Sequence, residues 1–559
     1  MVVFENKKEK LFVYTRQPSE TSYPAGLARS VHFAVSRNGA QYRPLHNNYG
    51  ILFAEAQISA DNTILPKGVK NPIIFPMPDG SYGIAAVRIN QDGSRDRDSE
   101  DSVLLWKTMD FIHFQCQGLV KKKGLDLGDI AQESIVIQGE TVSGSIVEID
   151  AGLCDRIWQH WNRIRHVDTY LPESVTFASE QELKEFRATA VYSDGSTALK
   201  KVRWQKEQVD FSVPGTYQVS GELYDRKYPF PLARGYGDPV IFQWEGKWHF
   251  LGTNDNLDDI GLYVREADTI ERLFAEDVKE HLILGVDEEK GFVQTFWAPE
   301  FHMIGGQPYI LFAVGGKVWG PQCYLMKLKS GGRITDADGW ETPVKILRQD
   351  GSPLAEDGIT LDMTYLLAGG NSYMVWSYRR HIGTPKDTGS MLYIARVNEE
   401  RPWQLAGEPV LLSRPLFGWE NVNGTINNEG PHGFVHSGKV YLAYSGGDAC
   451  GYTYALGLLT ADGTKDLTDI AVWEKSPTPI LSFYSVEGEY GPGHNSFFVD
   501  DDGNLMIAYH GETALESRLR CDGIRRVHFD IHGEPVFDMS ADRDLNPALC
   551  KVSMQVIVR

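Results

Sequence analysis

The sequence predicts an all-β protein whose C-terminal part is a five-bladed β-propeller. A strand–turn–strand pattern recurs five times after residue 225, at intervals of 62 to 67 residues. Each copy contains an apolar strand, a turn with glycine and a second apolar strand. A fixed period with one hairpin per period indicates a repeat architecture, and all-β repeats of this length are typical of propeller blades.

Each repeat carries one polar or ionisable residue at the head of its first strand. In a propeller the first strands line the central axis, so residues distant in sequence converge there. We therefore expect one shared site formed by the heads Asp238, Glu300, Asp362, Glu429 and His494, within the stretches 236–240, 297–300, 360–363, 427–431 and 491–495. Second strands are predicted at 248–251, 309–312, 373–376, 441–444 and 505–509, and third strands at 261–265, 392–396 and 454–458.

The chain before the repeats divides into three parts. Residues 1–125 are β-rich and include a strand–turn–strand pattern at 71–87, so we expect one or two blade-like sheets there. Residues 126–167 are predicted to be a connection, with a short helix over 153–161. Residues 168–224 contain short alternating strands, and residues 225–559 hold the propeller.

The segment 168–224 resembles bacterial immunoglobulin-like domains. Val202-x-Trp204 followed by Gly-x-Tyr-x-Val-x-Gly at 215–221 carries this likeness. The resemblance implies a small β-sandwich that acts as a spacer or packing partner, and no residue in it predicts chemistry.

Composition limits the partners and the compartment. With 559 residues the chain is too long for one ordinary domain, and its net charge of −20 argues against nucleic acid or an anionic membrane as a partner. The six cysteines show no paired spacing, and neither a signal peptide nor an apolar run of about 18 residues is evident. These features predict free thiols and a cytoplasmic location, and they leave the oligomeric state open.

Three convergent carboxyl groups predict acid–base chemistry. Asp238, Asp362 and Glu429 in one cleft cannot all ionise at their ordinary pKa values, because repulsion and desolvation raise the pKa of at least one. One ionised base and one protonated acid are the pair that glycoside hydrolysis needs. A single acid before proline or glycine is usually a turn or surface residue, but the shared repeat phase favours a catalytic role for the three together.

The same motifs resemble glycoside hydrolase family 43, whose members are five-bladed propellers that cleave arabinose- and xylose-containing glycans with inversion. The resemblance covers 225–559 and rests on Tyr-Gly-Asp-Pro, Trp-Ala-Pro-Glu, Thr-Leu-Asp-Met, Asn-Glu-Gly-Pro and Gly-Pro-Gly-His-Asn. It implies that Asp238 is the general base, Asp362 the pKa modulator and Glu429 the general acid. The retaining fructan hydrolases share the fold, but their Arg-Asp-Pro and Glu-Cys pairs are absent here.

Further roles are implied by the family likeness. Trp297 and Glu300 become candidates for substrate binding, against packing and architecture as alternatives. An arginine of the last blade often lies near the sugar hydroxyls, which gives Arg525 or Arg526. His494 becomes a candidate ligand of a structural Ca²⁺ on the axis, largely through water because calcium prefers six to eight oxygens. The chemistry itself requires no cofactor.

The favoured function is therefore an inverting, exo-acting α-L-arabinofuranosidase that acts on oligosaccharides. A β-D-xylosidase of the same family is the main alternative, since the loops between blades decide the sugar. A non-catalytic carbohydrate-binding propeller predicts loss of one of the three acids, and all three are present. A protein-interaction propeller gives no reason for convergent acids.

Overall fold

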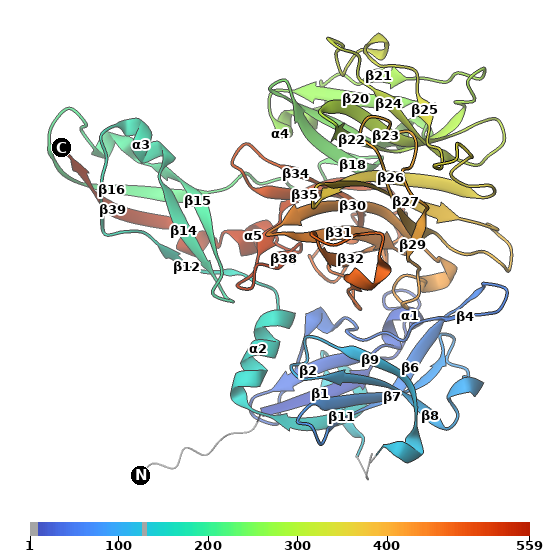
Figure 1. Ribbon diagram of the computed structural model, residues 1–559. Helices are drawn as coiled ribbons and strands as arrows, with labels where there is room; N and C mark the ends of the chain where they lie inside the picture. The colour runs from blue at the N-terminus through green and yellow to red at the C-terminus, as the bar shows by residue number, and fades with distance from the viewer. Residues whose placement is uncertain (1–8, 126–130) are drawn as a thin grey trace, which may run out of the picture.

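The computed structural model describes residues 9–125 and 131–559, and its regular structure is mainly strand. Figure 1 shows three bodies: an N-terminal β domain in blue, an elongated sheet with the C-terminus at its far end, and a propeller coloured from green to orange-red. The expected all-β class is confirmed.

The propeller consists of five four-stranded antiparallel sheets. Their innermost strands contact one another in a closed ring, β18–β22–β26–β30–β34 and back to β18. The blades are β18 (Tyr236–Trp244), β19 (Lys247–Asn254), β20 (Leu262–Ala267) and β21 (His281–Leu284); β22 (Gln294–Ile304), β23 (Gln307–Gly315), β24 (Gln322–Lys327) and β25 (Val344–Lys345); β26 (Ile359–Ala368), β27 (Asn371–Arg379), β28 (Met391–Arg396) and β29 (Val410–Ser413); β30 (Asn428–His436), β31 (Lys439–Gly446), β32 (Ala455–Asp462) and β33 (Trp473–Lys475); β34 (Tyr490–Val499), β35 (Leu505–Glu512), β36 (Cys521–Arg526) and β17 (Ala233–Arg234).

Local sequence explains the hairpins between first and second strands. In blades one to four the two turn residues both have positive φ, which is the two-residue turn that matches the twist of paired strands. Glycine takes the second position each time, because it adopts positive φ without steric cost. The turns are Glu245-Gly246, Gly305-Gly306, Gly369-Gly370 and Ser437-Gly438.

The ring is closed by a strand from the beginning of the propeller. The short strand β17 pairs with β36 and becomes the outer strand of blade five. Residues before blade one therefore complete the last blade, which leaves no gap between the first and last repeats. This closing strand is not part of the fivefold pattern that the sequence displays.

The N-terminal domain has two packed sheets and is larger than expected. A helix, α2 (Ala151–Trp161), packs on it through Leu153, Cys154, Ile157 and Trp161, which share its core. The region expected to be a connection thus supplies two strands and this helix; residues 126–130 of it lie outside the described chain. The sheets are β10 (Glu133–Ile137), β11 (Glu140–Ile149), β1 (Glu9–Thr15), β2 (His32–Ser36) and β3 (Arg43–Pro44), and β6 (Lys67–Pro76), β7 (Tyr82–Asn90), β8 (Ser102–Thr108) and β9 (Gln115–Lys121).

The immunoglobulin-like part is one six-stranded sheet that includes the end of the chain. Strand β39 (Lys551–Val558) lies between β16 and β13, antiparallel to the first and parallel to the second. The last strand therefore belongs to this sheet, although it was expected within the propeller segment. The other strands are β12 (His166–Tyr170), β13 (Ser174–Thr176), β14 (Arg187–Tyr192), β15 (Thr197–Trp204) and β16 (Gly215–Tyr224).

The remaining elements are short. Helix α3 begins at a serine whose side chain accepts the Glu182 N–H, as N-capping residues do. These elements are α1 (Ala25–Ala28), α3 (Glu180–Glu185), α4 (Ile270–Leu273), α5 (Ala541–Asp544), β4 (Gln57–Ile58), β5 (Ile64–Leu65), β37 (His528–Phe529) and β38 (Pro535–Val536).

The N-terminal domain packs on the loops that lead into blade four and blade five. Tyr23 stacks on Tyr484 with ring centroids 5.4 Å apart, and the Ala56 N–H donates to the Leu416 carbonyl at 2.7 Å. Residues of both parts share one apolar core, which includes Tyr49 and Phe53 from one side and Trp419, Tyr444 and Phe483 from the other. Burial on this scale makes the two parts one unit.

Candidate active site

A β-bulge in the first strand of every blade creates the site. In each case the pairing with the second strand slips so that two residues occupy one gap, and the first of these has positive φ. Bulges bend a strand and redirect side chains, and they are common beside active sites. The positive-φ residues are Asp238 (58°), Ala298 (46°), Asp362 (54°), Gly430 (55°) and His494 (43°).

The five residues expected at equivalent positions of the repeat do not all occupy the same position relative to the bulges. Asp238, Asp362 and His494 occupy equivalent positions, whereas Glu429 lies one residue before its bulge and Glu300 lies two residues after the equivalent Ala298. Strand β6 has the same bulge at Asn71, with φ of 51°, so the N-terminal sheet repeats the blade geometry without an acid.

Asp238 is buried among positive groups. Its Oδ1 accepts from Arg520 Nη1 at 3.0 Å and lies 3.0 Å from His494 Nδ1. Its Oδ2 accepts from the Thr253 hydroxyl at 2.5 Å. Burial alone raises the pKa of a carboxyl, but the charges of His494 and Arg520, with His510 nearby, hold the pKa of Asp238 well below its usual range. Asp238 is therefore ionised at neutral pH.

Glu429 has the opposite environment. Burial and then the neighbouring charge of Asp362 raise its pKa to about 8, although the Tyr454 hydroxyl donates to its Oε1 at 3.0 Å. Asp362 is also buried; its Oδ2 accepts from the Gly430 N–H and the Ser377 hydroxyl, both at 3.1 Å. Burial raises the pKa of Asp362 as well, while His494 opposes the shift. The site thus holds one ionised carboxylate and one protonated acid.

Residues of the second strands hold the bulges and were not anticipated from the sequence. The residue that faces the start of the bulge is polar in four blades, and it bonds to the axial group or the bulged backbone. Thr253 and Ser377 bind Asp238 and Asp362, the Ser445 hydroxyl accepts from the His494 N–H at 2.7 Å, and His510 Nδ1 accepts from the Asp238 N–H at 3.1 Å. A polar residue that recurs near the end of the second strand in four of the five blades was the signal that could have found them.

The arginine at the site is Arg520, and neither expected arginine contacts the acids. Arg525 pairs with Glu489 and Tyr509 inside blade five. Arg526, on the opposite face of the strand, pairs with Asp544 toward the immunoglobulin-like sheet at 2.7 Å. Arg520 precedes β36, where a loop rather than a strand sets its direction, so strand alternation could not identify it.

The side chains of Trp297 and Glu300 bond to residues other than the three candidate acids. The Trp297 indole N–H donates to Asp259 Oδ2 at 2.7 Å, and the ring packs against buried aliphatic side chains. Glu300 is buried, and its Oε2 lies 2.6 Å from His302 Nε2 and 4.0 Å from His432 Nε2. Burial lowers the pKa of His432 to about 4, so this imidazole is neutral at pH 7.

The expected calcium ion at His494 stays a prediction. His494 Nδ1 lies 3.0 Å from Asp238 Oδ1, and although burial opposes protonation, the charges of Asp238 and Asp362 raise the pKa of His494. One imidazole offers a single ligand atom, so most of a calcium shell would have to come from oxygen ligands such as water. In the structure His494 is a close polar partner of the candidate base.

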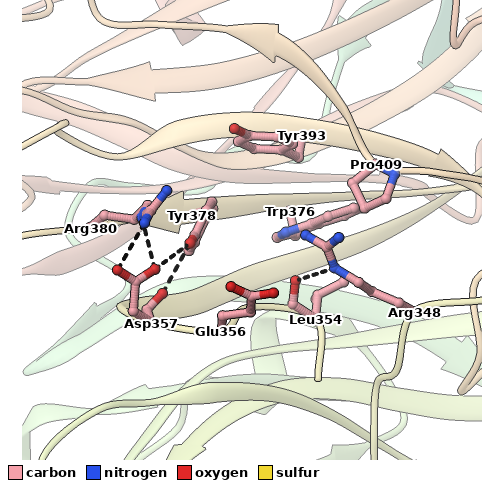
Figure 2. A pocket seen from close by; sticks show the side chains of 9 residues that line it. All are labelled: Arg348, Leu354, Glu356, Asp357, Trp376, Tyr378, Arg380, Tyr393 and Pro409. Carbon is pink, nitrogen blue, oxygen red and sulfur yellow. Dashed lines mark hydrogen bonds and ion pairs between the residues drawn. The ribbon is translucent and has the colours of Figure 1, made fainter. Parts of the chain in front are cut away.

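A separate cavity of 210 Å³ opens between blades two and three. Figure 2 shows Arg380 and Tyr378 pointing at Asp357, with Trp376 and Tyr393 forming aromatic walls. Because side chains alternate along β27, this cavity lies on the opposite face of the strand from Ser377, which binds Asp362. None of the three candidate acids lines it.

Buried carboxyls with opposed protonation states, gathered on a propeller axis, define the site of an acid–base hydrolase. The chain belongs to Glycosyl hydrolases family 43, whose model matches residues 231–533. The model of the bacterial Ig-like domain (group 4) matches residues 187–225, which confirms the second resemblance. Membership of the family brings no cofactor requirement for the chemistry.

Similar proteins carry arabinofuranosidase names. An "Extracellular exo-alpha-(1->5)-L-arabinofuranosidase" of Streptomyces avermitilis is 31% identical over 57% of this chain and 64% of its own length. A protein of the same name from Streptomyces chartreusis is 28% identical over 62% of this chain and 97% of its own. A crystal structure of an α-L-arabinofuranosidase from Lactobacillus brevis aligns with TM-score 0.49 and 28% identity, over 56% of this chain and 96% of that one.

The predicted cytoplasmic location is wrong on these comparisons, since both Streptomyces relatives are named as extracellular. The prediction depended on the lack of an evident signal peptide and on unpaired cysteines, and the described cysteines are indeed free. A propeller with a large buried core is stable without disulfides, so cysteine usage does not report its compartment. Within the described residues, no helix combines the length and the apolar character needed to cross a membrane.

Proposed function

We propose that this chain is an exo-acting glycoside hydrolase that releases terminal α-L-arabinofuranose from oligosaccharides with inversion. The opposed states of Asp238 and Glu429 carry this proposal: the first is kept ionised by positive neighbours, the second is kept protonated by burial and Asp362. The names of the relatives support the choice of sugar and the exo mode.

In this mechanism Glu429 donates its proton to the glycosidic oxygen as the bond to the anomeric carbon breaks. Asp238 accepts a proton from a water molecule, whose oxygen bonds to that carbon from the opposite face. The sugar leaves with inverted configuration, and proton exchange with solvent restores both carboxyls. Asp362 keeps the pKa of Glu429 high through its charge and proximity.

The test of the mechanism is ¹H NMR of the first product formed from an aryl α-L-arabinofuranoside. We expect the β-anomer to appear first and to mutarotate afterwards. Initial release of the α-anomer would contradict the assignment of Asp238 as a base that activates water. A matched aryl β-D-xyloside should react far more slowly. Faster cleavage of the xyloside would contradict the choice of arabinofuranose and favour a β-D-xylosidase.

Variants separate the two roles. Asp238→Asn should lose about 10²–10⁴-fold or more in kcat with every substrate, because it removes general-base assistance. Glu429→Gln should lose as much with arabino-oligosaccharides but little with a nitrophenyl leaving group, which departs without protonation. Asp268→Asn, at an acid with an 80% exposed side chain, is the matched control and should leave kcat unchanged.

A further inference from the structure

Three side chains from the innermost strands of blades two and four meet with the composition of a metal site. Glu300 and His302 lie two residues apart on β22, and His432 lies on β30. One potential ligand atom from each lies within 4.8 Å of the other two. Blade three separates blades two and four, so an ion bound by all three side chains would link two blades that are not neighbours in the ring.

From this arrangement we propose that Glu300, His302 and His432 form a binding site for a zinc-like divalent ion, distinct from the candidate catalytic acids. One carboxylate oxygen and two imidazole nitrogens are ligands that Zn²⁺ prefers, whereas calcium requires an oxygen-rich shell. The fourth position of a tetrahedral ion is left for water. The proposed function does not depend on this site.

The distances fit such an ion after small movements. Glu300 Oε2 lies 2.6 Å from His302 Nε2 and 4.0 Å from His432 Nε2. Ligands of a tetrahedral zinc, with bonds of about 2.0–2.2 Å, lie roughly 3.3 Å apart. The two measured separations fall on either side of this value, so a shift of under about 1 Å in the carboxylate would satisfy both.

Hydrogen bonding leaves His432 without a partner, which is the second observation in favour of a ligand. Its Nδ1 is buried and makes no hydrogen bond among the described residues, and its Nε2 lies too far from Glu300 to donate to it. Nε2 is the nitrogen that faces Glu300, so its lone pair is available to an ion or a water, whereas the buried Nδ1 would stay without a partner. The ring is held instead by stacking on His302, with centroids 5.8 Å apart.

Blade three also contacts His302. Its Nε2 lies 3.4 Å from both the Thr364 hydroxyl and the Tyr365 N–H, on the first strand of blade three. These long contacts reach the same nitrogen that lies 2.6 Å from Glu300, so an ion bound at Nε2 would replace them.

The experiment uses the full-length chain without a histidine tag, stripped of metal with a chelator and dialysed. Zn²⁺ is titrated by calorimetry, and Co²⁺ serves as an optical probe because tetrahedral Co²⁺ absorbs strongly in the visible. We expect one equivalent bound per chain, visible Co²⁺ bands and an increase in Tm with Zn²⁺ but not with Ca²⁺.

His432→Gln should weaken Zn²⁺ binding about tenfold or more and abolish the Co²⁺ bands, while circular dichroism shows the fold retained. Glu300→Gln tests the carboxylate in the same way, should one variant fail to fold. His113→Ala, at a histidine whose side chain is 77% exposed, and Cys116→Ser control for adventitious surface binding and should match the parent chain. Failure of the folded parent chain to bind Zn²⁺, or unchanged binding by both site variants, would overturn the proposal.

Discussion

The proton on Glu429 links activity to stability. Its pKa is about 8 in the folded protein and near 4.5 when exposed, so between these values unfolding releases a proton. The stability that the protonated form provides is complete below about pH 4.5 and is lost as pH rises through about 8. The environment that keeps Glu429 protonated therefore lowers the free energy of unfolding at neutral and alkaline pH.

Glu429→Gln should accordingly stabilise the protein while it removes activity. The amide cannot ionise, so the variant avoids the loss between pH 4.5 and 8. We expect a higher Tm than the parent at pH 8 and a difference that shrinks toward pH 4.5, measured by calorimetry. Asp268→Asn, again the exposed control, should follow the parent at every pH. A lower Tm for Glu429→Gln at pH 8 would refute the burial argument.

Arg520 lowers the pKa of Asp238, and a substitution can test this effect by itself. Its guanidinium binds both Asp238 and Asp255, the latter at 2.9 Å, and lies on the side of the candidate base. Arg520→Gln removes a positive charge next to Asp238, so the pKa of that carboxyl should rise. The acidic limb of the kcat/KM profile should move upward by about one pH unit or more, with the alkaline limb little changed.

The matched control for this prediction is Arg518→Gln. Arg518 carries the same charge two residues earlier, but its side chain is 66% exposed and pairs with Asp448. Its pH profile should overlay that of the parent. An unmoved acidic limb in Arg520→Gln would show that His494 and Thr253 alone keep Asp238 ionised.

At the scale of the strands, the hairpin pattern and the acid-bearing first strands could be predicted from the sequence. Apolar alternation and glycine turns are local signals, and the blade period repeats them five times. The bulges could not be predicted, because an inserted residue leaves the alternation of apolar and polar side chains intact on both sides of the bulge. The sequence pattern therefore does not show where the pairing slips. That is why Glu429 and Glu300 were placed in the phase of Asp238, and why Thr253 and His510 were missed.

Pairings between distant segments were also beyond the sequence patterns. Strand β17 joins β36, and β39 joins β16 and β13, across hundreds of residues in each case. A six- to eight-residue apolar segment does not indicate which strand it will pair with. The pairing depends on which sheet edge the rest of the fold leaves open. The same limit explains why residues 133–149 looked like a connection.

Removal of β39 should destabilise the immunoglobulin-like sheet selectively. Truncation after Cys550 removes the strand that pairs with β13 and exposes the edge of β16. We expect this sheet to become sensitive to protease while the propeller keeps the proposed arabinofuranosidase activity. Limited proteolysis with mass spectrometry, together with kcat/KM, measures both; truncation after Val556 is a milder control. Loss of activity in step with cleavage would show that the two parts fold as one unit.

At the scale of the whole molecule, the N-terminal domain supports the loops that precede Glu429. Gly26 and Gly418 approach so closely that a side chain at either would overlap the backbone oxygen of the other. The contact continues through Gln91, whose amide donates to Asn421 Oδ1 at 2.7 Å. The propeller holds the same segment from its other side, because Glu420 pairs with Lys475 and the Asn428 N–H donates to the Ser390 carbonyl. The N-terminal domain thus adds a second support to the approach to the candidate acid.

Gly418→Val should therefore lower activity without touching the acids. The added side chain would force the N-terminal domain away from the 414–424 loop, and we expect a lower Tm and a reduced kcat/KM. Gly407→Ala is the control, because its added carbon meets no atom closer than 3.8 Å. A Gly418→Val protein with normal kcat/KM and a lower Tm would limit the domain to a stabilising role.

The placement of β39 has a consequence for the chain as it leaves the ribosome. Synthesis runs from the N-terminus, so β14, β15 and β16 emerge long before their partner β39. Blade five waits in the same way, with β17 unpaired until β36 is complete. Both sheets are therefore completed only after the strands of blade five have been made. A chain released early would display two open strand edges, which marks it for proteolysis before it can accumulate.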